Sequence, residues 1–338
     1  MTGTGPVPGE RLAPLPPAGS LALAVDADQQ RATRAAWLYF VTGLTQAQIA
    51  KRLGLNRSRV NRLLAQARSD GLVQIRITGK LASCVELEEQ LQRTFGLDGA
   101  IVVPTPPGQA LIPQVIATAA GAALAERLKD GMSVGVGWGR TLRLSLQSVP
   151  RLPLQRLSVV SLLGGLTRGS AMNPHETASH LADLVGAQCY YVAAPALTDT
   201  QSTRDVLMSQ PMLREVFDRG ERVDLAFLSV GELSATSTMS RVGLITGLEV
   251  EELAAAGAVG DICAHWIDRN GVLVDHPLNS RVVALSPQKL LGIPCVILAS
   301  GGRAKVAGLL GALRGRMADV LITDELTAKG ILAQNLVP

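Results

Sequence analysis

Two glycine-rich segments each combine backbone freedom with cationic side chains, which suits an anion site. They are Gly137-Trp-Gly-Arg-Thr141 and Gly301-Gly-Arg-Ala-Lys305. Glycine lets the backbone approach a ligand closely, and a helix that begins after such a turn offers unpaired N–H groups to an anion. The first segment is not a dinucleotide fingerprint, because Arg140 occupies the position of the third glycine, and it is not a P-loop, because no Gly-Lys-Ser/Thr follows. Gly164-Gly165 forms a third, similar turn. Close packing of a helix against a strand also uses glycine, but three such turns together favour an anionic ligand.

A strongly basic stretch near the start of the chain is the second candidate for binding. Residues 31–80 hold ten Lys and Arg against the single acid Asp70, whereas the whole chain carries a net charge of +4. Such a local excess is typical of a surface that binds a polyanion, and DNA is the commonest one. A basic face that meets only solvent is the alternative. Trp37 and Tyr39 are expected in the core of the first helix of this stretch.

The same stretch predicts two helices joined by a tight turn. Thr45 and Gln48 have the spacing of a capping box, and Gly54 is suited to end the helix that they begin. After the turn, Asn56 is suited to cap the next helix. The buried face of that helix is predicted from its i, i+3, i+4, i+7 spacing to be Val60, Leu63, Leu64 and Ala67.

The other face of the second helix carries side chains that can read base edges. Arg can pair with guanine and Asn with adenine, and a helix with one buried face fits a DNA major groove. The preceding helix is better placed for phosphate contacts. The predicted DNA-binding residues are Thr45, Gln46, Lys51, Arg57, Ser58, Arg59, Asn61 and Arg62. A three-helix packing unit that does not bind DNA is the alternative.

The glycine-rich turns follow apolar runs of strand length that alternate with helical patterns. Continuous hydrophobicity indicates strands covered on both faces, and the alternation predicts an α/β fold with a mostly parallel, doubly wound sheet. Ligands bind at the carboxyl ends of such strands, where these turns lie. The runs are residues 100–103, 133–136, 157–160, 188–192, 224–228, 294–298 and 319–323.

The chain is long enough for two domains. Residues 1–29, rich in Pro and Gly, are expected to be a disordered tail. Residues 30–80 are expected to form a helix-turn-helix domain of the winged type, because residues 71–77 alternate as a short strand would. Residues 81–338 are expected to form the ligand-binding domain.

Composition argues against several other classes of protein. The four cysteines lie far apart without a C-x-x-C pair, which disfavours a zinc site and a disulfide framework. The chain start lacks the order of a signal peptide, and no apolar run approaches the roughly 18 residues of a membrane span. His175 and His180 are one residue too far apart for a zincin pair. We therefore expect a cytoplasmic protein with no metal, no cofactor and no membrane partner.

Residues 31–338 resemble the SorC/DeoR family of sugar-binding bacterial transcription regulators. In the basic stretch the resemblance lies in Leu44-Thr-Gln-Ala-Gln-Ile-Ala50 and Leu53-Gly-Leu-Asn-Arg-Ser-Arg-Val60. In the remainder it lies in Trp138-Gly-Arg-Thr141, Leu163-Gly-Gly165, Pro195 with the two preceding alanines, Asp224-Leu-Ala-Phe227, Val230-Gly231, Val259-Gly-Asp-Ile262, Asp268-Arg-Asn-Gly271, Gly301-Gly-Arg-Ala-Lys305 and Leu321-Ile-Thr-Asp324.

The resemblance implies a Rossmann-like effector domain similar to sugar-phosphate isomerases, which would also form a dimer or tetramer on an operator in double-stranded DNA. It implies a small carbohydrate effector, commonly a phosphorylated sugar or polyol. The phosphate would lie at Gly137–Thr141 and Gly301–Lys305, and Asp261 would bind sugar hydroxyls with help from Glu232. The expected effector-binding residues are Gly137, Trp138, Gly139, Arg140, Thr141, Gly164, Gly165, Glu232, Asp261, Gly301, Gly302 and Lys305. Trp138 could equally stack on a sugar or close the pocket floor.

A sugar-phosphate isomerase with an accessory basic domain is the rival interpretation. Its acid and base groups would come from His265, Asp268, Asp275 and His276. Polar residues at strand ends near a sugar pocket would explain the same side chains without catalysis. We therefore expect a regulator with no catalytic residues.

Overall fold

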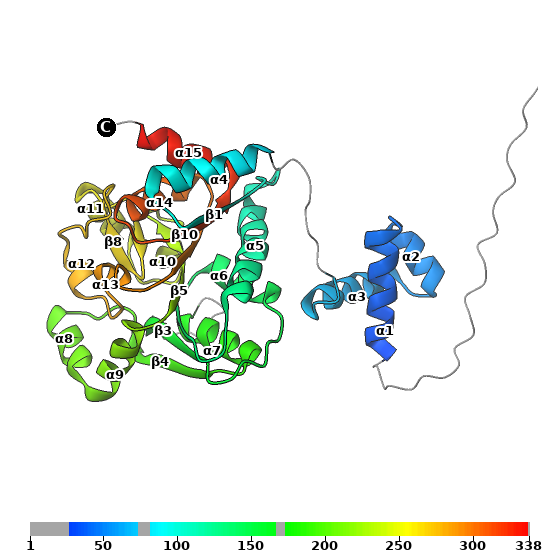
Figure 1. Cartoon of the computed structure of the whole chain (residues 1–338), viewed down its shortest axis with the longest axis horizontal. Helices are drawn as coiled ribbons and strands as arrows, with labels where there is room; N and C mark the ends of the chain where they lie inside the picture. Colours follow the sequence, from blue (N-terminus) through cyan, green and yellow to red (C-terminus); the bar gives the residue numbers. More distant parts are fainter. Residues whose placement is uncertain (1–26, 74–81, 167–172, 337–338) are drawn as a thin grey trace, which may run out of the picture. The chain divides into compact units, whose positions relative to one another are not determined.

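The computed structural model describes residues 27–73, 82–166 and 173–336 of the chain (Figure 1). Contacts within the chain divide it into two compact units, residues 1–74 and 75–338. The sequence-based boundary at 80/81 falls among residues outside the described ranges, and so does most of the tail expected at residues 1–29. The two units are described separately below.

The small unit is helical. Its apolar core combines alanines of the first helix with aliphatic side chains of the other two, including Ile49, Val60 and Leu63. The first helix begins at Ala27, inside the segment expected to be a tail. The predicted wing reaches into residues 74–81, outside the described ranges, and residues 71–73 form no strand. The helices are α1 (Ala27–Ala36), the π-helical η1 (Trp37–Val41), α2 (Gln46–Leu53) and α3 (Arg57–Ser69).

Trp37 does not join the core of the small unit, and that prediction was wrong. Its side chain is 60% exposed, whereas Tyr39 is partly buried against the core. The cause is the change from α- to π-helix after Ala36, where the amide of Thr42 donates to the carbonyl of Trp37 at 3.2 Å. An i→i+5 turn rotates side chains away from the 3.6-residue period on which the prediction relied.

The large unit is built on a parallel sheet, as predicted. All seven apolar runs are strands of it, and every described pairing in it is parallel. The order across the sheet is β1-β10-β9-β5-β2-β3-β4. The strands are β1 (Gly99–Val103), β2 (Ser133–Val136), β3 (Ser158–Gly165), β4 (Gln188–Pro195), β5 (Leu225–Leu228), β9 (Val296–Ala299) and β10 (Val320–Asp324).

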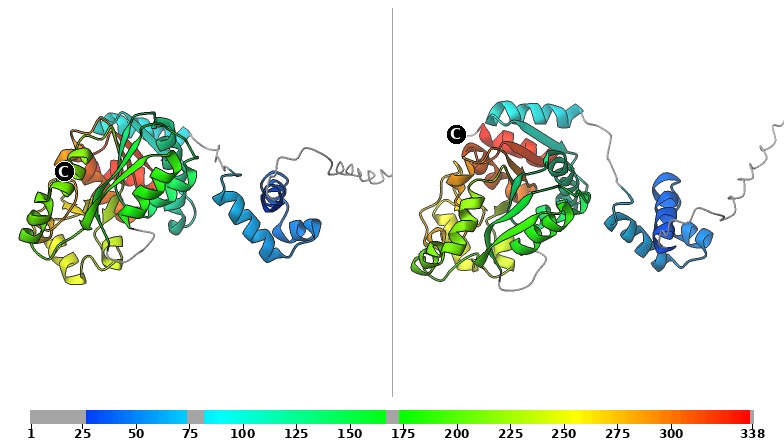
Figure 2. Two further views of the ribbon diagram at one scale, coloured as in Figure 1. Left: turned by 90° about the horizontal axis from the view of Figure 1, so that it is seen from below. Right: turned by 60° about the horizontal axis from the view of Figure 1, so that its bottom comes forward.

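Helices cover both faces of this sheet (Figure 2). Along β5, Leu225 and Phe227 pack into one apolar cluster, while Ala226 and Leu228 pack into the other. This explains the continuous hydrophobicity of the strand.

The described helices of the large unit, whether or not they cover the sheet, are α4 (Ala82–Phe95), η2 (Gln109–Leu111), α5 (Ile112–Arg127), α6 (Arg140–Ser145), η3 (Leu146–Ser148), α7 (Pro174–Val185), α8 (Gln201–Ser209), α9 (Pro211–Gly220), α10 (Thr238–Arg241), α11 (Gly247–Ala255), α12 (Pro277–Ser280), α13 (Pro287–Leu290), η4 (Arg303–Lys305), α14 (Val306–Arg314) and α15 (Glu325–Asn335).

A small antiparallel sheet lies between β5 and β9 in the sequence and was not predicted. Its strands are β6 (Val230–Glu232), β7 (Gly260–Ile262) and β8 (His265–Ile267). Each spans only three residues, which is too short for a hydrophobic period to be recognised. Gly231 pairs directly with Asp261 across β6 and β7.

The strand order of the large sheet reverses between β2 and β5. From β2 the chain continues to its neighbour β3, while from β5 it reaches the strand on the other side, β9. In open α/β sheets such a reversal leaves a crevice at the carboxyl ends of the two strands. The segments that follow β2 and β5 are therefore the first place to look for a ligand site. No helix in the described ranges combines the length and apolar character that a bilayer crossing requires.

Candidate functional site

The helix-turn-helix of the small unit has the capping predicted from its sequence. Gln48 N donates to Thr45 Oγ1 at 3.3 Å, and Thr45 N donates to Gln48 Oε1 at 2.9 Å, which completes the capping box. Gly54 ends α2 in the left-handed conformation with φ of 66°. Asn56 caps α3 by accepting a hydrogen bond from Arg59 N at 2.8 Å. These local bonds fix where α3 starts.

The two faces of α3 also match the prediction. Val60, Leu63, Leu64 and Ala67 are buried, while the side chains of Arg57, Ser58, Asn61 and Arg62 are exposed. Arg59 is half-buried. Thr45, which caps α2, and Lys51 on α2 are exposed, and Arg57 Nε donates to Gln46 Oε1 at 3.4 Å. The start of α3 and the start of α2 thus share one open face rich in hydrogen-bond donors, which has the composition of a DNA-reading surface.

A pocket of about 150 Å³ lies at the reversal point of the large sheet. It is formed by the segments that follow β2 and β5, with contributions from β7, α10 and η4. Seven of the expected effector-binding residues meet there: Trp138, Gly139, Arg140, Thr141, Glu232, Asp261 and Lys305. The sequence reasoning missed Pro113, Ser229, Val230, Gly231, Thr238, Met239 and Arg241. Ser229 follows a strand directly and could have been found by the strand-end rule, whereas no sequence signal pointed to Arg241.

Asp261 is a buried carboxyl in this pocket, only 4% exposed. It fits because Gly231 lies opposite, where a Cβ would overlap the carboxylate oxygen Oδ1 of Asp261. Burial raises the pKa of Asp261 to about 6, and the Glu232 carboxylate adds to the rise, while the Lys305 ammonium and a hydrogen bond to the Ala264 backbone oppose it. Asp261 is therefore able to change charge near neutral pH.

Lys305 supplies the cation that Asp261 faces. Its Nζ donates to the carbonyl oxygen of Val230 at 2.6 Å, and Ser300 Oγ donates to the same oxygen at 3.1 Å. Burial lowers the pKa of Lys305, whereas the charges of Glu232 and Asp261 favour its protonated form. With Arg140 and Arg241, the pocket presents three cationic side chains against two carboxyl groups. This arrangement suits a ligand that carries an anionic group and several hydroxyls.

The remaining expected residues do not line this pocket. Gly137 lies directly after β2 and is buried against Leu228. Gly164 has Ala194 and Pro195 carbonyls within 2.6 Å of where its Cβ would be, and Gly165 faces the His175 ring. These glycines are explained by close packing, of Gly164 against backbone and of Gly137 and Gly165 against side chains.

Gly301 and Gly302 precede Lys305 but also stay outside the pocket. The amide of Gly302 donates to Thr327 Oγ1 at 2.7 Å and to Asp324 Oδ1 at 3.2 Å. It is therefore already hydrogen-bonded within the protein. A contact between these two glycines and a ligand remains a prediction.

The acid and base groups of an isomerase do not converge on the pocket. His265 is buried, its Nδ1 lies 3.1 Å from the carbonyl oxygen of Cys263, which can only accept, and burial lowers its pKa to about 4. Asp268 accepts the amides of Asn270 and Val272 within its own turn. His276 caps α12. Each of these side chains has a structural partner instead.

His175, one of the two histidines compared with a zincin pair, also has a structural contact. His175 Nε2 lies 2.9 Å from Val192 O. No group of three or more His, Cys, Asp or Glu in the described residues is arranged to hold a metal ion.

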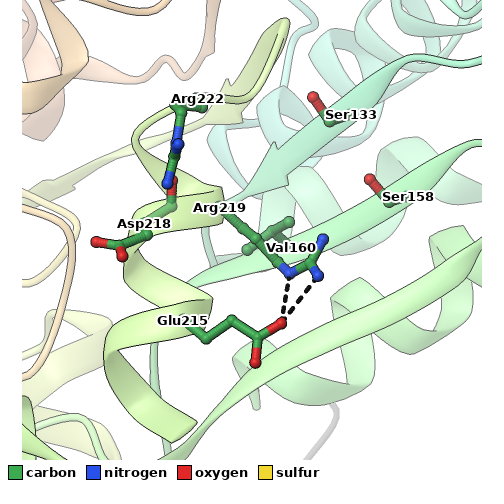
Figure 3. A pocket seen from close by; sticks show the side chains of 7 residues that line it. All are labelled: Ser133, Ser158, Val160, Glu215, Asp218, Arg219 and Arg222. Atoms are coloured by element: carbon green, nitrogen blue, oxygen red, sulfur yellow. Dashed lines mark hydrogen bonds and ion pairs between the residues drawn. The ribbon is translucent and has the colours of Figure 1, made fainter. Parts of the chain in front are cut away.

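A larger hollow of about 400 Å³ lies at the opposite end of the sheet (Figure 3). Ser133 and Ser158, the first residues of β2 and β3, form one wall, and α9 forms the other. Two arginines and two acids line it, so its formal charges balance. The Arg219 guanidinium already binds Glu215 at 2.9 Å and lies over the Tyr190 ring at 4.3 Å. Since ligands of doubly wound sheets bind at the carboxyl ends of the strands, the smaller pocket is the better candidate for a ligand site.

Comparison with known families gives two matches along the chain. A family model described as "Putative sugar-binding domain" matches residues 80–333, and one described as "Sigma-70, region 4" matches residues 37–69. The two matches fall on the large and the small unit respectively.

Curated relatives align over nearly the whole chain. The "Erythritol catabolism regulatory protein EryD" of Brucella abortus (strain 2308) is 37% identical over 91% of this chain and 98% of its own length. The "Deoxyribonucleoside regulator" of Bacillus subtilis (strain 168) is 31% identical over 90% of this chain and 97% of its own length. Among solved structures, the full-length sorbitol operon regulator SorC of Klebsiella pneumoniae is 27% identical, with a TM-score of 0.68 over 91% of this chain and 100% of that one.

Proposed function

This chain belongs to the SorC/DeoR family of sugar-binding transcriptional regulators, and on that premise we propose which of its residues bind DNA and effector and which effector class it takes. It is a DNA-binding transcriptional regulator controlled by a small carbohydrate, and its relatives are regulators rather than enzymes. The finer assignments below are our own.

We assign base reading to the exposed start of α3. Arg57, Ser58, Asn61 and Arg62 carry the donors and acceptors that base edges require, and they project from the face opposite the buried stripe. Thr45, Gln46 and Lys51 would contact phosphates, with Arg59 at the flank of the helix. Phosphate contacts would supply much of the affinity and make it depend on salt.

We assign the effector to the pocket between β2 and β5, and we propose that it is a phosphorylated sugar or polyol. Lys305, Arg140 and Arg241 would hold the phosphate, while Asp261 and Glu232 would accept hydrogen bonds from hydroxyls. Because Lys305 is already bonded to Val230 O, a phosphate would add to an ordered cation and need not recruit a mobile one. The relative named for erythritol catabolism makes four-carbon polyols a sensible starting point for the search.

We further propose that the protein acts in the cytoplasm as a homo-oligomer, a dimer or a tetramer. Two copies of α3 could then reach successive major grooves of a palindromic operator. The effector would favour one of two arrangements of the copies and thereby change the affinity for the operator.

The observation that carries this proposal is the convergence of seven expected residues at the reversal point of the sheet. The test measures two activities of the full chain. Gel shifts with its own promoter region should show binding that weakens steeply with salt. A thermal-shift screen of sugars, polyols and their phosphates should find a compound that raises the melting temperature, because a ligand specific to the folded state stabilises it. Salt-insensitive binding, or no stabilising compound among the anionic sugars, would count against the assignment.

A further inference from the structure

A buried carboxylate that the site description does not use lies close to the pocket. Asp324, the last residue of β10, is fully buried, and no ion pair involving it occurs in the part of the chain that the structure describes. Its charge is met by hydrogen bonds instead. Thr105 Oγ1 donates to Oδ2 at 2.6 Å, Gly302 N donates to Oδ1 at 3.2 Å, and the hydroxyl of Thr327 donates to Oδ1. A buried charge needs such compensation, because burial without partners is costly.

These bonds join three segments that are far apart in the sequence. Thr105 follows β1, Gly302 follows β9, and Thr327 lies in the first turn of α15. Both hydroxyls also accept a hydrogen bond from a backbone amide. Leu326 N donates to Thr105 Oγ1 at 2.9 Å, and Gly302 N donates to Thr327 Oγ1 at 2.7 Å. The side chain of Asp324 is the centre of this network.

The network sets the path of the loop that leads to Lys305. A Cβ on Gly301 would lie 2.6 Å from Asp324 Oδ1, so the backbone passes directly against the carboxylate. Gly302 then adopts φ of 104°, and its carbonyl accepts a hydrogen bond from Lys305 N at 2.9 Å. Three residues after the Asp324 contact, the Lys305 side chain enters the pocket and reaches Val230 O. A shift of the Gly302 peptide would therefore move Lys305.

We propose that Asp324 is a positioning residue for the effector site: it fixes the Gly301–Lys305 turn so that the Lys305 ammonium is held in the pocket. Asp324 does not itself line the pocket. The role in effector binding rests on the proposed function. The effect of Asp324 on the position of Lys305 does not depend on it and can be tested without a ligand. It also gives Gly301 and Gly302 a role that needs no contact with the ligand.

A purely structural role is the competing explanation, because Asp324 also caps α15 through Thr327 N at 3.4 Å. A cap alone would affect stability but not the state of Lys305. Thr246 provides a matched control, since it caps α11 by accepting Glu249 N at 3.2 Å and lies outside both the pocket and the Asp324 network.

The first test needs no ligand. The chain has six lysines, so protein labelled with ¹⁵Nζ,¹³Cε-lysine gives a simple NMR spectrum in which loss of a signal in Lys305→Met assigns Lys305. We expect Asp324→Asn to shift the Lys305 signal and its titration midpoint, and Thr105→Val to do so more weakly. Thr246→Ala should leave the signal unchanged. An unmoved Lys305 signal in folded Asp324→Asn or Thr105→Val overturns the proposal.

The second test uses erythritol 4-phosphate, with inorganic phosphate as the minimal anion, in calorimetric titrations of the full chain. We expect Asp324→Asn to weaken binding of whichever probe binds the wild-type protein by about tenfold. In the Lys305→Met background the same substitution should cause no further loss, because the effects of groups that act through one another are not additive. Additive losses contradict the positioning role. If neither probe binds the wild-type protein, the phosphate assignment fails, while the NMR result still decides the role of Asp324.

Discussion

Asp261 and Lys305 are the residues whose charges respond most to their surroundings in the pocket. Asp261 is buried and Lys305 is partly buried, and each favours the charged form of the other. Removing Lys305 leaves Asp261 without its cation, whereas removing Asp261 still leaves Lys305 the charge of Glu232. Loss of a partner at a buried charge is the usual reason for large effects at such sites. The residue-scale predictions therefore separate the charge of Asp261 from that of Lys305.

Asp261→Asn should change how the stability of the large unit depends on pH between 4 and 6. Burial raises the Asp261 pKa from an ordinary 3.8 to about 6, so in this range the folded state retains a proton that the unfolded chain has released. The free energy of unfolding then falls as pH rises through the window. Asn removes this contribution, which amounts to about 3 kcal/mol across the window, since one pKa unit corresponds to about 1.36 kcal/mol.

Urea unfolding at several pH values measures this slope. The lowered pKa of His265 has the opposite effect, because the unfolded chain binds a proton at pH values where the folded state keeps His265 neutral, so the free energy of unfolding falls on acidification. This contribution is the same in the wild type and in Asp261→Asn. Asp199→Asn, at an exposed carboxyl, is the control and should keep the wild-type slope. Parallel curves for wild type and Asp261→Asn would show that Asp261 titrates as an ordinary carboxyl.

Lys305→Met should strongly reduce stabilisation by a phosphorylated effector and leave operator binding without effector intact. The physical reason is the loss of a pre-ordered cation from the pocket. Thermal shift and gel shift on the same protein measure the two activities. Lys289→Met removes the same charge from an exposed pair with Glu221 and should change neither. Equal damage to both activities would mean that Lys305 acts by folding rather than by binding.

Arg62→Ala should have the opposite profile. Arg62 is exposed on the face of α3 opposite the buried stripe, and loss of a base contact costs about 1–3 kcal/mol, or about 5- to 150-fold in affinity. Effector-induced stabilisation should be unchanged. Arg93→Ala on α4 removes the same charge from an exposed residue of the large unit and should bind DNA as the wild type does. Unaltered operator binding by Arg62→Ala would move base reading to another part of α3.

At the scale of elements, the site depends on a small sheet that the sequence did not reveal. Gly231→Ala should displace Asp261, because the new Cβ would overlap its carboxylate oxygen. Overpacking of this kind costs about 1–3 kcal/mol of stability, and effector binding should be lost along with it. Gly247→Ala is a suitable control, since no atom lies within 4 Å of its new Cβ. Normal effector binding by Gly231→Ala would show that β6 can shift to accept the new Cβ without displacing Asp261 from the pocket.

The long elements were predictable because their patterns are local. The seven strands of the parallel sheet have continuous apolar runs, and α2 and α3 have caps and a regular buried stripe, so composition and spacing were sufficient. The antiparallel sheet was not predictable, because three-residue strands depend on tertiary contacts such as the pairing of Gly231 with Asp261. Trp37 was misplaced because a π-helical turn breaks the period without a sequence signal.

Candidate residues of the pocket were predictable only where their chemistry was unusual. Lys305 was identified from its glycine-rich motif and Asp261 from the family resemblance, and both line the pocket. Arg241, on the four-residue helix α10, had no recognisable context. Glycine was ambiguous, because Gly139 lines the pocket whereas Gly164 and Gly165 are explained by close packing within the protein. A single sequence does not separate these two uses of glycine.

At the scale of the whole molecule, the charge distribution predicts how DNA binding responds to salt. The ten Lys and Arg of residues 31–80 stand in a chain whose net charge is only +4, so the remainder is acidic overall and would repel DNA. Affinity for the operator should therefore fall linearly with salt on logarithmic axes, with a slope set by the phosphates contacted. Lys51→Ala should reduce that slope by about one, whereas Lys289→Ala should not; fluorescence anisotropy at several salt concentrations measures both.

Control of one unit by the other requires a reciprocal effect that can be measured. If the effector changes operator affinity by a given factor, the operator must change effector affinity by the same factor, because both ligands bias one equilibrium. Coupling of about 1–3 kcal/mol would correspond to a 5- to 150-fold change. Titrating the effector into the full chain with and without saturating operator DNA measures one factor, and anisotropy with and without effector measures the other. Lys305→Met should reduce both factors together, since it removes a contact with the effector and none with the DNA. Two unequal factors would mean that the ligands act on different forms of the protein, such as oligomers that exchange during the measurement.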